Sequence, residues 1–298
     1  MPNAKIADPG AALAFGSALA YCCLNVGVRF MIDELSVAGI LVVRGLVGVI
    51  VTVMAARAFK KRLFGGNKKL LLLIGLCGSL STICTTTAIA RIPLYQALVL
   101  LYLYPALSVV FAYFINSSSI SLRDGALAAL AFCGCLVLIW PDSSAGLALD
   151  PGHFIGLGGA ALYGLGFVLA SRLGDENCGL EPVFYYSLWS LIGLFAAIAA
   201  LDLPTGLGGA RPVGAAVGLA VIALTAMLMG YAALRWLAPY KVGVIGTLEV
   251  FGGALSSWLI FHDPITFRAL IGGMIILTAA LKLRQGPAAA KGGSEAED

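Results

Sequence analysis

Long apolar stretches recur along almost the whole chain, and short polar turns separate them. Each stretch reaches the roughly 17 to 25 residues that a helix needs to cross the hydrocarbon core of a bilayer. Because lipid offers backbone amides no hydrogen-bond partners, a spanning segment of this kind is expected to be helical. The pattern predicts ten transmembrane helices, at residues 10–31, 36–56, 70–89, 94–115, 122–140, 153–172, 182–201, 213–235, 241–261 and 266–284.

The composition agrees with this pattern. Of the 298 residues 60% are hydrophobic and 11% are charged, whereas a soluble domain carries about 25% charged residues. The connections between the predicted spans are too short for a separate soluble domain. Residues 285–298 combine Gly, Ala, Ser and acidic residues, have nothing to bury, and are expected to be disordered.

Cysteine and histidine give no metal or redox chemistry. Of the seven cysteines, six lie inside predicted spans without His or Asp at metal-ligand spacing, so we expect them to pack in the core. The two histidines, His153 and His262, lie near the ends of predicted spans, and we expect both at the surface. The sequence therefore predicts no metal and no cofactor.

Basic residues are distributed unequally between the two sides of the predicted membrane domain. Fourteen Lys and Arg residues fall on the side of the N-terminus and four on the other side. Because basic loops stay on the cytoplasmic face, both termini are predicted to be cytoplasmic. The cluster around Lys60 follows a span directly and serves this topology, so no nucleic-acid partner is expected. The four residues on the predicted outer side are Arg29, Arg91, Arg211 and Arg268.

The two halves of the chain resemble each other. A shift of 145 positions aligns 94–96 with 239–241 and 119–123 with 264–268, so the turn after the fourth span matches the turn after the ninth. Each half holds five spans, an odd number, and equivalent loops therefore lie on opposite sides of the membrane. The sequence predicts two inverted five-helix repeats, at 1–140 and 151–284, which supply outward-open and inward-open states around a central site.

Three short motifs and one arginine inside the second predicted span point to a family. The motifs are LYPAL at 103–107, LEVF at 248–251 and DPIT at 263–266 before a Gly272-Gly273 helix, and the arginine is Arg44. Together with the five-plus-five arrangement, they resemble the EamA-type members of the drug/metabolite transporter superfamily over essentially the whole chain. The chain departs from the family pattern at Val250, where a proline is frequent, and at Tyr21-Cys22-Cys23, where a tryptophan is usual.

This resemblance implies a fold and an activity. The expected fold is an all-α polytopic membrane protein with ten transmembrane helices around a central cavity. The expected function is export of aromatic and other neutral amino acids across the bacterial inner membrane by alternating access. The resemblance does not imply an oligomeric state, an energy source or a particular amino acid.

Only two charged side chains, Arg44 and Glu249, lie well inside predicted spans. A charge at the centre of a span costs about 2.5 to 3.5 kcal/mol on insertion scales, so each needs a partner or a role. Two readings of Glu249 are open: it pairs with Arg44 or with hydroxyls as a brace, or it binds an ammonium group or a proton during transport. Small residues share its helical face and should turn it into the bundle, namely Gly246, Gly252, Gly253 and Ser256.

Hydroxyl and aromatic side chains are candidates for the walls of a site. Thr82 and Thr86 lie one turn apart in a hydroxyl-rich third span, although hydroxyls in helices also bond to their own backbone. Pro105 accompanies the aromatic residues of the fourth span. A buried phenol needs a polar partner, so the candidate substrate contacts are Tyr21, Tyr95, Tyr102, Tyr163 and Tyr231.

Three other functions were weighed. An enzyme would need paired acids, a metal set or an activated nucleophile, and the spans contain none of these. A channel would show a continuous polar stripe, whereas polarity here concentrates near the middle of the spans. Among carriers, a cationic drug would suit phenols, hydroxyls and one carboxylate nearly as well as an amino acid.

Overall fold

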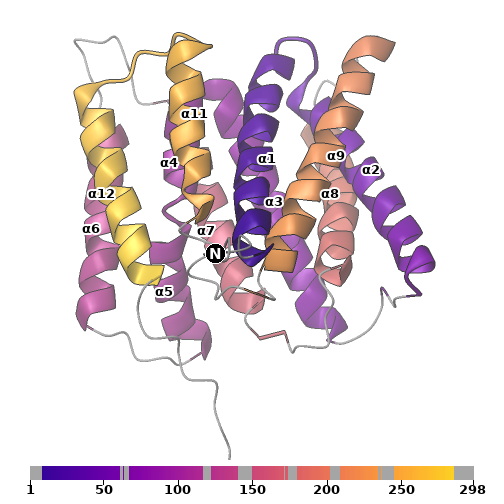
Figure 1. Ribbon diagram of the computed structural model, residues 1–298, viewed down its shortest axis with the longest axis horizontal. Helices are drawn as coiled ribbons and strands as arrows, with labels where there is room; N and C mark the ends of the chain where they lie inside the picture. The colour runs from indigo at the N-terminus through magenta and orange to yellow at the C-terminus, as the bar shows by residue number, and fades with distance from the viewer. Residues whose placement is uncertain are drawn as a thin grey trace, which may run out of the picture.

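The computed structural model describes residues 9–60, 63, 67–116, 122–139, 150–170, 172–173, 180–201, 209–233, 236 and 245–284. These residues form helices and turns without any strand, and the helices stand side by side in one bundle (Figure 1). The all-α prediction is thereby confirmed. The helices are α1 (Pro9–Met31), α2 (Val37–Ala58), α3 (Lys68–Arg91), α4 (Leu94–Leu101), α5 (Tyr104–Asn116), α6 (Leu122–Ile139), α7 (Pro151–Ala170), α8 (Leu180–Leu201), α9 (Ala210–Ala233), α11 (Leu248–Leu259) and α12 (Phe267–Arg284).

Several helices begin at a side-chain cap that the sequence supplies. Ser36 accepts a hydrogen bond from the Gly39 amide at the start of α2, and Asn67 accepts one from Leu70 at the start of α3. Before α7, the Asp150 carboxylate accepts a 2.6 Å hydrogen bond from the Gly152 amide, and a proline follows at the first helical position. These caps satisfy amides that have no partner within the helix.

The outer surface of the bundle is apolar. Within the described residues, six helical stretches are long and apolar enough to cross a bilayer by themselves: Pro9–Met31, Val37–Ala58, Lys68–Arg91, Leu94–Ile115, Pro151–Ala170 and Ala210–Gly230. Large side chains on several helices project outward, where lipid is the solvent that suits them, among them Leu19, Met54, Phe114, Phe195 and Met274. The chain is a polytopic membrane protein.

The fourth predicted span is broken in the structure. Instead of one helix over 94–115, α4 ends at Leu101 and α5 begins at Tyr104. Pro105 accounts for the break, because a proline has no amide proton and its ring clashes with the carbonyl four residues earlier. The second half has a matching interruption, a turn at Thr247 just before α11. A shift of 145 positions carries the first break onto the second.

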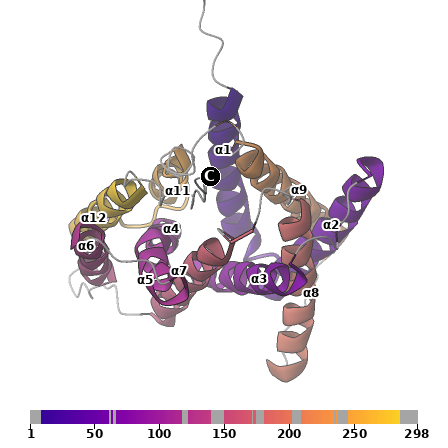
Figure 2. The same cartoon turned by 90° about the horizontal axis from the view of Figure 1, so that it is seen from below.

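Helix contacts also match between the halves. Helix α3 packs on α7 and α8, just as α9 packs on α1 and α2, and the equivalent pairs α2–α8, α4–α11 and α6–α12 meet each other. Figure 2 shows α6 with α12 at one edge and α2 with α8 towards the other. The start of α7 lies beside the end of α3, since a Cβ at Gly152 would fall 2.8 Å from Arg91 Cβ. Helix α1 also ends there, so α1 and its equivalent α7 run in opposite directions.

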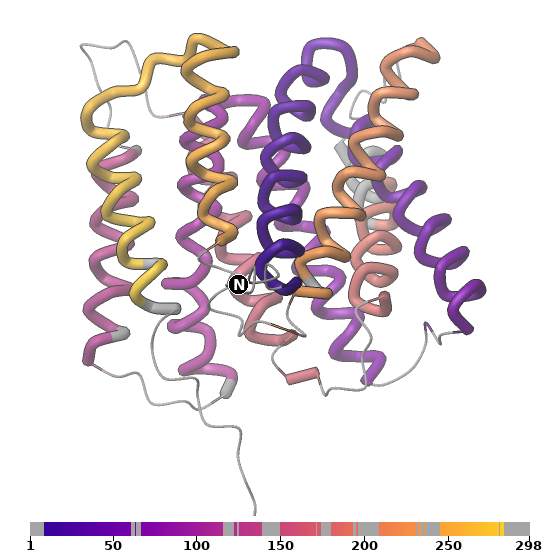
Figure 3. The backbone as a smooth tube through the Cα atoms, viewed as in Figure 1, coloured from indigo at the N-terminus to yellow at the C-terminus, as the bar shows by residue number. Residues whose placement is uncertain are grey.

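The start of α1 and the end of α12 lie on one face of the bundle, as Figure 3 shows. Arg172 donates a hydrogen bond to the Ile115 carbonyl on this face, and Arg123 donates one to the Lys282 carbonyl at 3.5 Å. Arg123, Arg172 and Lys282, which the sequence predicts on the inner side, thus lie on the same face as the start of α1 and the end of α12. The assignment of that face to the cytoplasm stays a prediction.

The limits of the two repeats also stay a prediction. Their connection at 140–149 lies outside the described residues, as does the tail 285–298 that the sequence predicts to be disordered.

Candidate functional site

Glu249 lies where three elements meet. It stands in the first turn of α11, directly after the break, and only 8% of it is exposed. The Asn25 amide of α1 donates a 2.7 Å hydrogen bond to one carboxylate oxygen. The Tyr102 hydroxyl, at the break between α4 and α5, shares its one proton between the Gly246 carbonyl and the other carboxylate oxygen, which lies 3.2 Å away. Two residues of the first half therefore hold the carboxylate of the second half. One is Asn25 on α1, and the other is Tyr102 at the break between α4 and α5.

The small residues around Glu249 let the neighbouring helices approach. A Cβ at Gly252 would lie 2.4 Å from Cys22 Sγ of α1, and a Cβ at Gly253 would lie 2.2 Å from Leu98 Cδ1 of α4. Large apolar side chains of α11 such as Phe251 and Leu255 point outward instead, each more than half exposed. The prediction that the glycine face of this helix turns into the bundle is confirmed.

The hydrogen bonds to Glu249 compensate the cost of its position. A charge at the centre of an isolated span costs about 2.5 to 3.5 kcal/mol, and a hydrogen bond to a charged group contributes about 1.5 to 3 kcal/mol. Asn25 and Tyr102 are neutral, so they satisfy the carboxylate without neutralising it. Among the hydrogen-bond partners of Glu249 in the described part of the chain, none carries a charge.

Of the two kinds of partner predicted for Glu249 as a brace, Arg44 or hydroxyls, the described structure shows a hydroxyl, that of Tyr102, and not Arg44. Both carboxylate oxygens take their hydrogen bonds from Asn25 and Tyr102. Arg44 is half-buried on α2, a helix that packs against α8 and α9 rather than against α11. Helix placement decides this outcome, because two charges inside the bilayer attract each other only if the bundle brings their helices together.

Aromatic rings extend from this centre towards α7. Tyr104 contacts Tyr102 with ring centroids 6.1 Å apart and Tyr163 of α7 at 4.7 Å, in edge-to-face geometry. Phe167, one turn further along α7, lies 5.9 Å from the same ring. The buried Pro105 follows Tyr104 in the first turn of α5. Of the predicted tyrosines, the structure thus connects Tyr102 and Tyr163 through Tyr104.

The other predicted site residues make none of the contacts described above for Glu249 and Tyr104. Thr82 hydrogen-bonds the Gly78 carbonyl of its own helix at 3.1 Å and the Tyr186 hydroxyl of α8 at 2.9 Å. Thr86 is buried at 3% exposure in α3. Tyr21 is half-buried on α1, one turn before Asn25, and the side chain of Tyr231 lies outside the described part of the structure.

Tyr95 belongs to a second polar cluster near the opposite face from the termini. Its hydroxyl donates to the Pro264 carbonyl at 3.2 Å and accepts from the Gln96 amide at 3.0 Å. The Gln96 carbonyl oxygen lies 2.9 Å from His153 Nε2. His153 is only 7% exposed, so its predicted surface position is wrong, whereas the exposed position predicted for His262 is confirmed. This cluster joins α4, α7 and the turn before α12.

Replacing Gln96 with Leu is expected to lower the free energy of unfolding by about 1 to 3 kcal/mol, because the buried His153 Nε2 loses its partner. Thermal unfolding of the detergent-purified protein measures this. The double variant Gln96→Leu/His153→Leu should recover part of the loss, since removing both partners is nearly neutral. His262→Asn is the control, because its exposed side chain has a positive φ of 54° that Asn tolerates. An unchanged melting temperature for Gln96→Leu would refute the stabilising role.

Asn25 is a residue of this candidate site that the sequence alone did not indicate. The available signal was its being the only amide side chain in the first apolar span, four residues after Tyr21 and so on the same helical face. A neutral amide carries a smaller burial cost than a charge, so it attracted no attention. Its part in the site depends on the packing of α1 against α11, which brings its amide to Glu249.

Comparison with known proteins identifies relatives along the whole chain. The EamA-like transporter family matches residues 8–140 and 150–284. Two curated relatives, both named pseudopaline exporter CntI and both from strains of Pseudomonas aeruginosa, are 22% identical over 275 residues, which is 92% of this chain and 95% of theirs. A solved structure described only as the crystal structure of a protein superposes with a TM-score of 0.61 at 17% identity, over 91% of this chain and 94% of the other.

Proposed function

The chain belongs to the EamA-like transporter family, and we propose that it exports amino acids, aromatic and other neutral ones, by alternating access around Glu249. One observation carries this proposal: a single buried carboxylate stands at the junction of α1 with two broken helices, held by neutral partners. Substrate sites of carriers with inverted repeats lie at such discontinuous helices near the bilayer midplane. The name of the two relatives as exporters supports the direction of transport.

The hydrogen bonds of Glu249 suggest how substrate is bound and released. An ammonium group is a cation with three donors, so it satisfies the carboxylate better than the neutral Asn25 and Tyr102. Because Asn25 belongs to the first half and Glu249 to the second, the bond between them joins the repeats. In our mechanism the ammonium group takes the place of these donors, loosens the contact between the halves, and lets the site open to the other side.

The carrier proposal is tested in proteoliposomes loaded with unlabelled L-phenylalanine. Uptake of labelled phenylalanine should saturate and overshoot by counterflow, and external leucine should inhibit it. Linear flux without counterflow would indicate a channel instead. Export of organic cations is the second candidate, favoured by the absence of a cationic side chain among the described hydrogen-bond partners of Glu249. Inhibition by a cationic dye but not by leucine would establish it.

We also propose that both termini are cytoplasmic, in the inner membrane of a bacterium. The unequal distribution of Lys and Arg supports this orientation. A reporter that is active only in the cytoplasm, fused after residue 298, should be active. An inactive reporter that becomes active when it is inserted in the turn between α1 and α2 would reverse the orientation.

Tyr102→Phe is expected to slow counterflow by about 3- to 10-fold, because it removes the hydroxyl that positions the Glu249 carboxylate, and a typical hydrogen bond contributes about 0.5 to 1.5 kcal/mol net. The initial rate per folded molecule measures the effect. Tyr113→Phe is the matched control, since this tyrosine is half exposed on α5. Equal rates for the two variants would remove Tyr102 from the site.

A further inference from the structure

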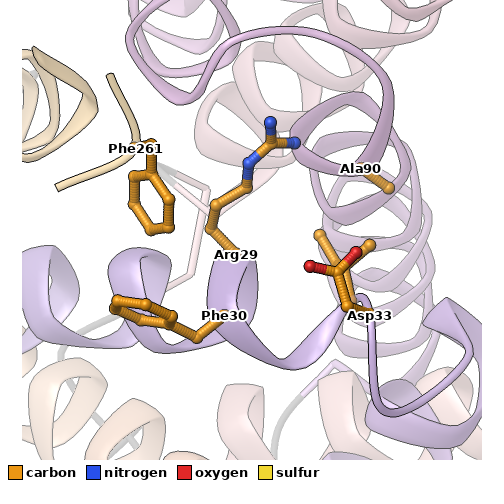
Figure 4. Close-up of a pocket in the computed structure, with 6 residues that line it drawn as sticks. Arg29, Phe30, Asp33, Ala90 and Phe261 are labelled. Carbon is orange, nitrogen blue, oxygen red and sulfur yellow. The ribbon is translucent and has the colours of Figure 1, made fainter. Parts of the chain in front are cut away.

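A cavity lies away from Glu249, at the ends of α1, α3 and α11 that face away from the start of α1 and the end of α12. Its volume is about 360 Å³, and its lining combines one cation, one anion and apolar side chains (Figure 4). The proposed function does not use this cavity. The lining residues are Arg29, Phe30, Ile32, Asp33, Ala90 and Phe261.

Arg29 is fixed in place but keeps donors for a ligand. Its Nη1 donates a 2.6 Å hydrogen bond to the Ile89 carbonyl in the last turn of α3, and its guanidinium lies 5.9 Å from the centre of the Phe261 ring. A guanidinium has several N–H donors in one plane, and this carbonyl uses only one of them. Such a held guanidinium suits a carboxylate, which it binds with two parallel hydrogen bonds.

Asp33 supplies the opposite charge on the other side of the Arg29 side chain. It is exposed in the turn after α1, and Figure 4 shows its carboxylate beside Ala90, whereas Phe30 and Phe261 lie across the cavity. Within the described part of the chain no ion pair joins Asp33 to Arg29, so the two charges face the cavity separately. A cation and an anion held apart in this way complement a zwitterion.

The aromatic side chains that line the cavity, and its volume, further restrict which ligands fit. The rings of Phe30 and Phe261 contact each other with centroids 4.9 Å apart and offer a surface to an apolar or aromatic side chain. Ligand pockets span about 300 to 1,000 Å³, so this cavity stands at the small end of the range. It suits one amino acid better than a drug-sized cation.

We propose that this cavity is a second binding site for a zwitterionic amino acid. Arg29 holds the carboxylate, Asp33 holds the ammonium group, and the side chain packs on Phe30 and Phe261. The proposal rests on the proposed function, because it gives the carrier's substrate class to a separate site. It also adds something that Glu249 alone does not provide, which is a requirement for a carboxylate in the substrate.

The position of the site along α1 connects it with Glu249. Tyr21, Asn25 and Arg29 are spaced by four residues and so lie on one face of the helix. Arg29 is about 6 Å beyond Asn25 at 1.5 Å per residue. Glu249 of α11 faces the middle of this stripe, and Phe261, just after the end of α11, lies at the end of the stripe. The seam between α1 and α11 therefore leads from the central carboxylate to the cavity, on the side that the charge distribution predicts to be outside.

Equilibrium binding to the detergent-purified protein tests this site with three probes: L-phenylalanine, 3-phenylpropionate, which has only the carboxylate, and phenethylamine, which has only the ammonium group. All measurements are made in the wild type and with Glu249→Gln. Asp33→Asn should weaken the binding of phenylalanine and of phenethylamine by at least about 10-fold, because it removes the charge that pairs with their ammonium group. The affinity for phenylpropionate, which has no ammonium group, should stay within about 2-fold of the wild type. Arg29→Gln should weaken the binding of phenylalanine and of phenylpropionate, which have a carboxylate, and leave the binding of phenethylamine unchanged.

Two variants keep the test valid if Arg29→Gln unfolds through loss of its bond to Ile89. Asp33 makes no hydrogen bond in the described structure, so Asp33→Asn leaves the fold intact, and Ala90→Trp fills the cavity without changing a charge. Binding of phenylalanine to the Glu249→Gln protein that neither variant weakens would overturn the proposal, as would a complete absence of such binding. If the wild-type protein showed no counterflow in proteoliposomes, the carrier function would be rejected instead. That conclusion would not depend on how the Arg29→Gln and Asp33→Asn proteins bind the three probes.

Discussion

Glu249→Gln is expected to slow counterflow of phenylalanine by at least about 30-fold while the protein stays folded. Truncating a buried charge that binds an opposite charge costs about 2 to 5 kcal/mol, and every 1.4 kcal/mol is about tenfold. Gln has the same shape as Glu, so its carbonyl oxygen still accepts from Asn25 and its amide still reaches Tyr102. The variant therefore removes the charge and leaves the local packing unchanged. Initial rates per folded molecule, after reconstitution at matched protein density, measure the effect.

A second substitution at the same position separates transport from bracing. Glu249→Ala leaves the buried Asn25 amide without its acceptor, which costs about 1 to 3 kcal/mol, so the melting temperature should fall. Glu249→Gln should melt close to the wild type. If Glu249→Gln transported phenylalanine at the wild-type rate and with the same substrate range, the carboxylate would be a brace and the proposed site would be wrong.

The spans could be predicted from the sequence because hydrophobic length is a local property. The predicted spans 10–31 and 36–56, for example, correspond to Pro9–Met31 and Val37–Ala58 in the structure. The break before Pro105 follows from a local rule, because a proline interrupts the helix that precedes it. The break at Thr247 has no proline, because Val250 occupies the matching position. It depends on the packing of α11 against α1 and α4, which no local pattern contains.

The candidate site was predicted only in part, and the reason is the same. Glu249 could be found from the cost of its charge, and Tyr102 from the need of a deep phenol for a partner. The choice between Arg44 and a hydroxyl as the partner of Glu249, and the part taken by Asn25, could not be predicted, because both depend on which helices are neighbours. His153 was misplaced because distance from a span end says nothing about burial between helices, where Gln96 satisfies its ring.

Gly272→Ala is expected to destabilise the protein, in contrast to the same change at the next residue. A Cβ at Gly272 of α12 would lie 2.6 Å from the Gly134 carbonyl oxygen and 2.7 Å from the Leu138 amide nitrogen, both backbone atoms of α6. Backbone cannot rotate away as a side chain does, so the two helices must separate. Overpacking of this kind costs about 1 to 3 kcal/mol, and occasionally more. Close backbone approach through small residues is a main source of helix association in lipid, so the loss should be visible as a lower melting temperature.

Gly273→Ala is the matched control for this prediction. Its Cβ would lie 3.6 and 3.7 Å from the methyl groups of Val99, which is ordinary van der Waals contact. Both substitutions replace Gly by Ala inside the same helix and gain the same helix propensity, about 0.8 to 1 kcal/mol, so this contribution cancels in the comparison. Because α6 and α12 pair at the edge of the bundle (Figure 2), Gly272→Ala should leave the transport rate per folded molecule unchanged. Equal melting temperatures for the two variants would show that α6 and α12 adjust to the added methyl group, and the stability of the pair would then have to come from the apolar side chains along it.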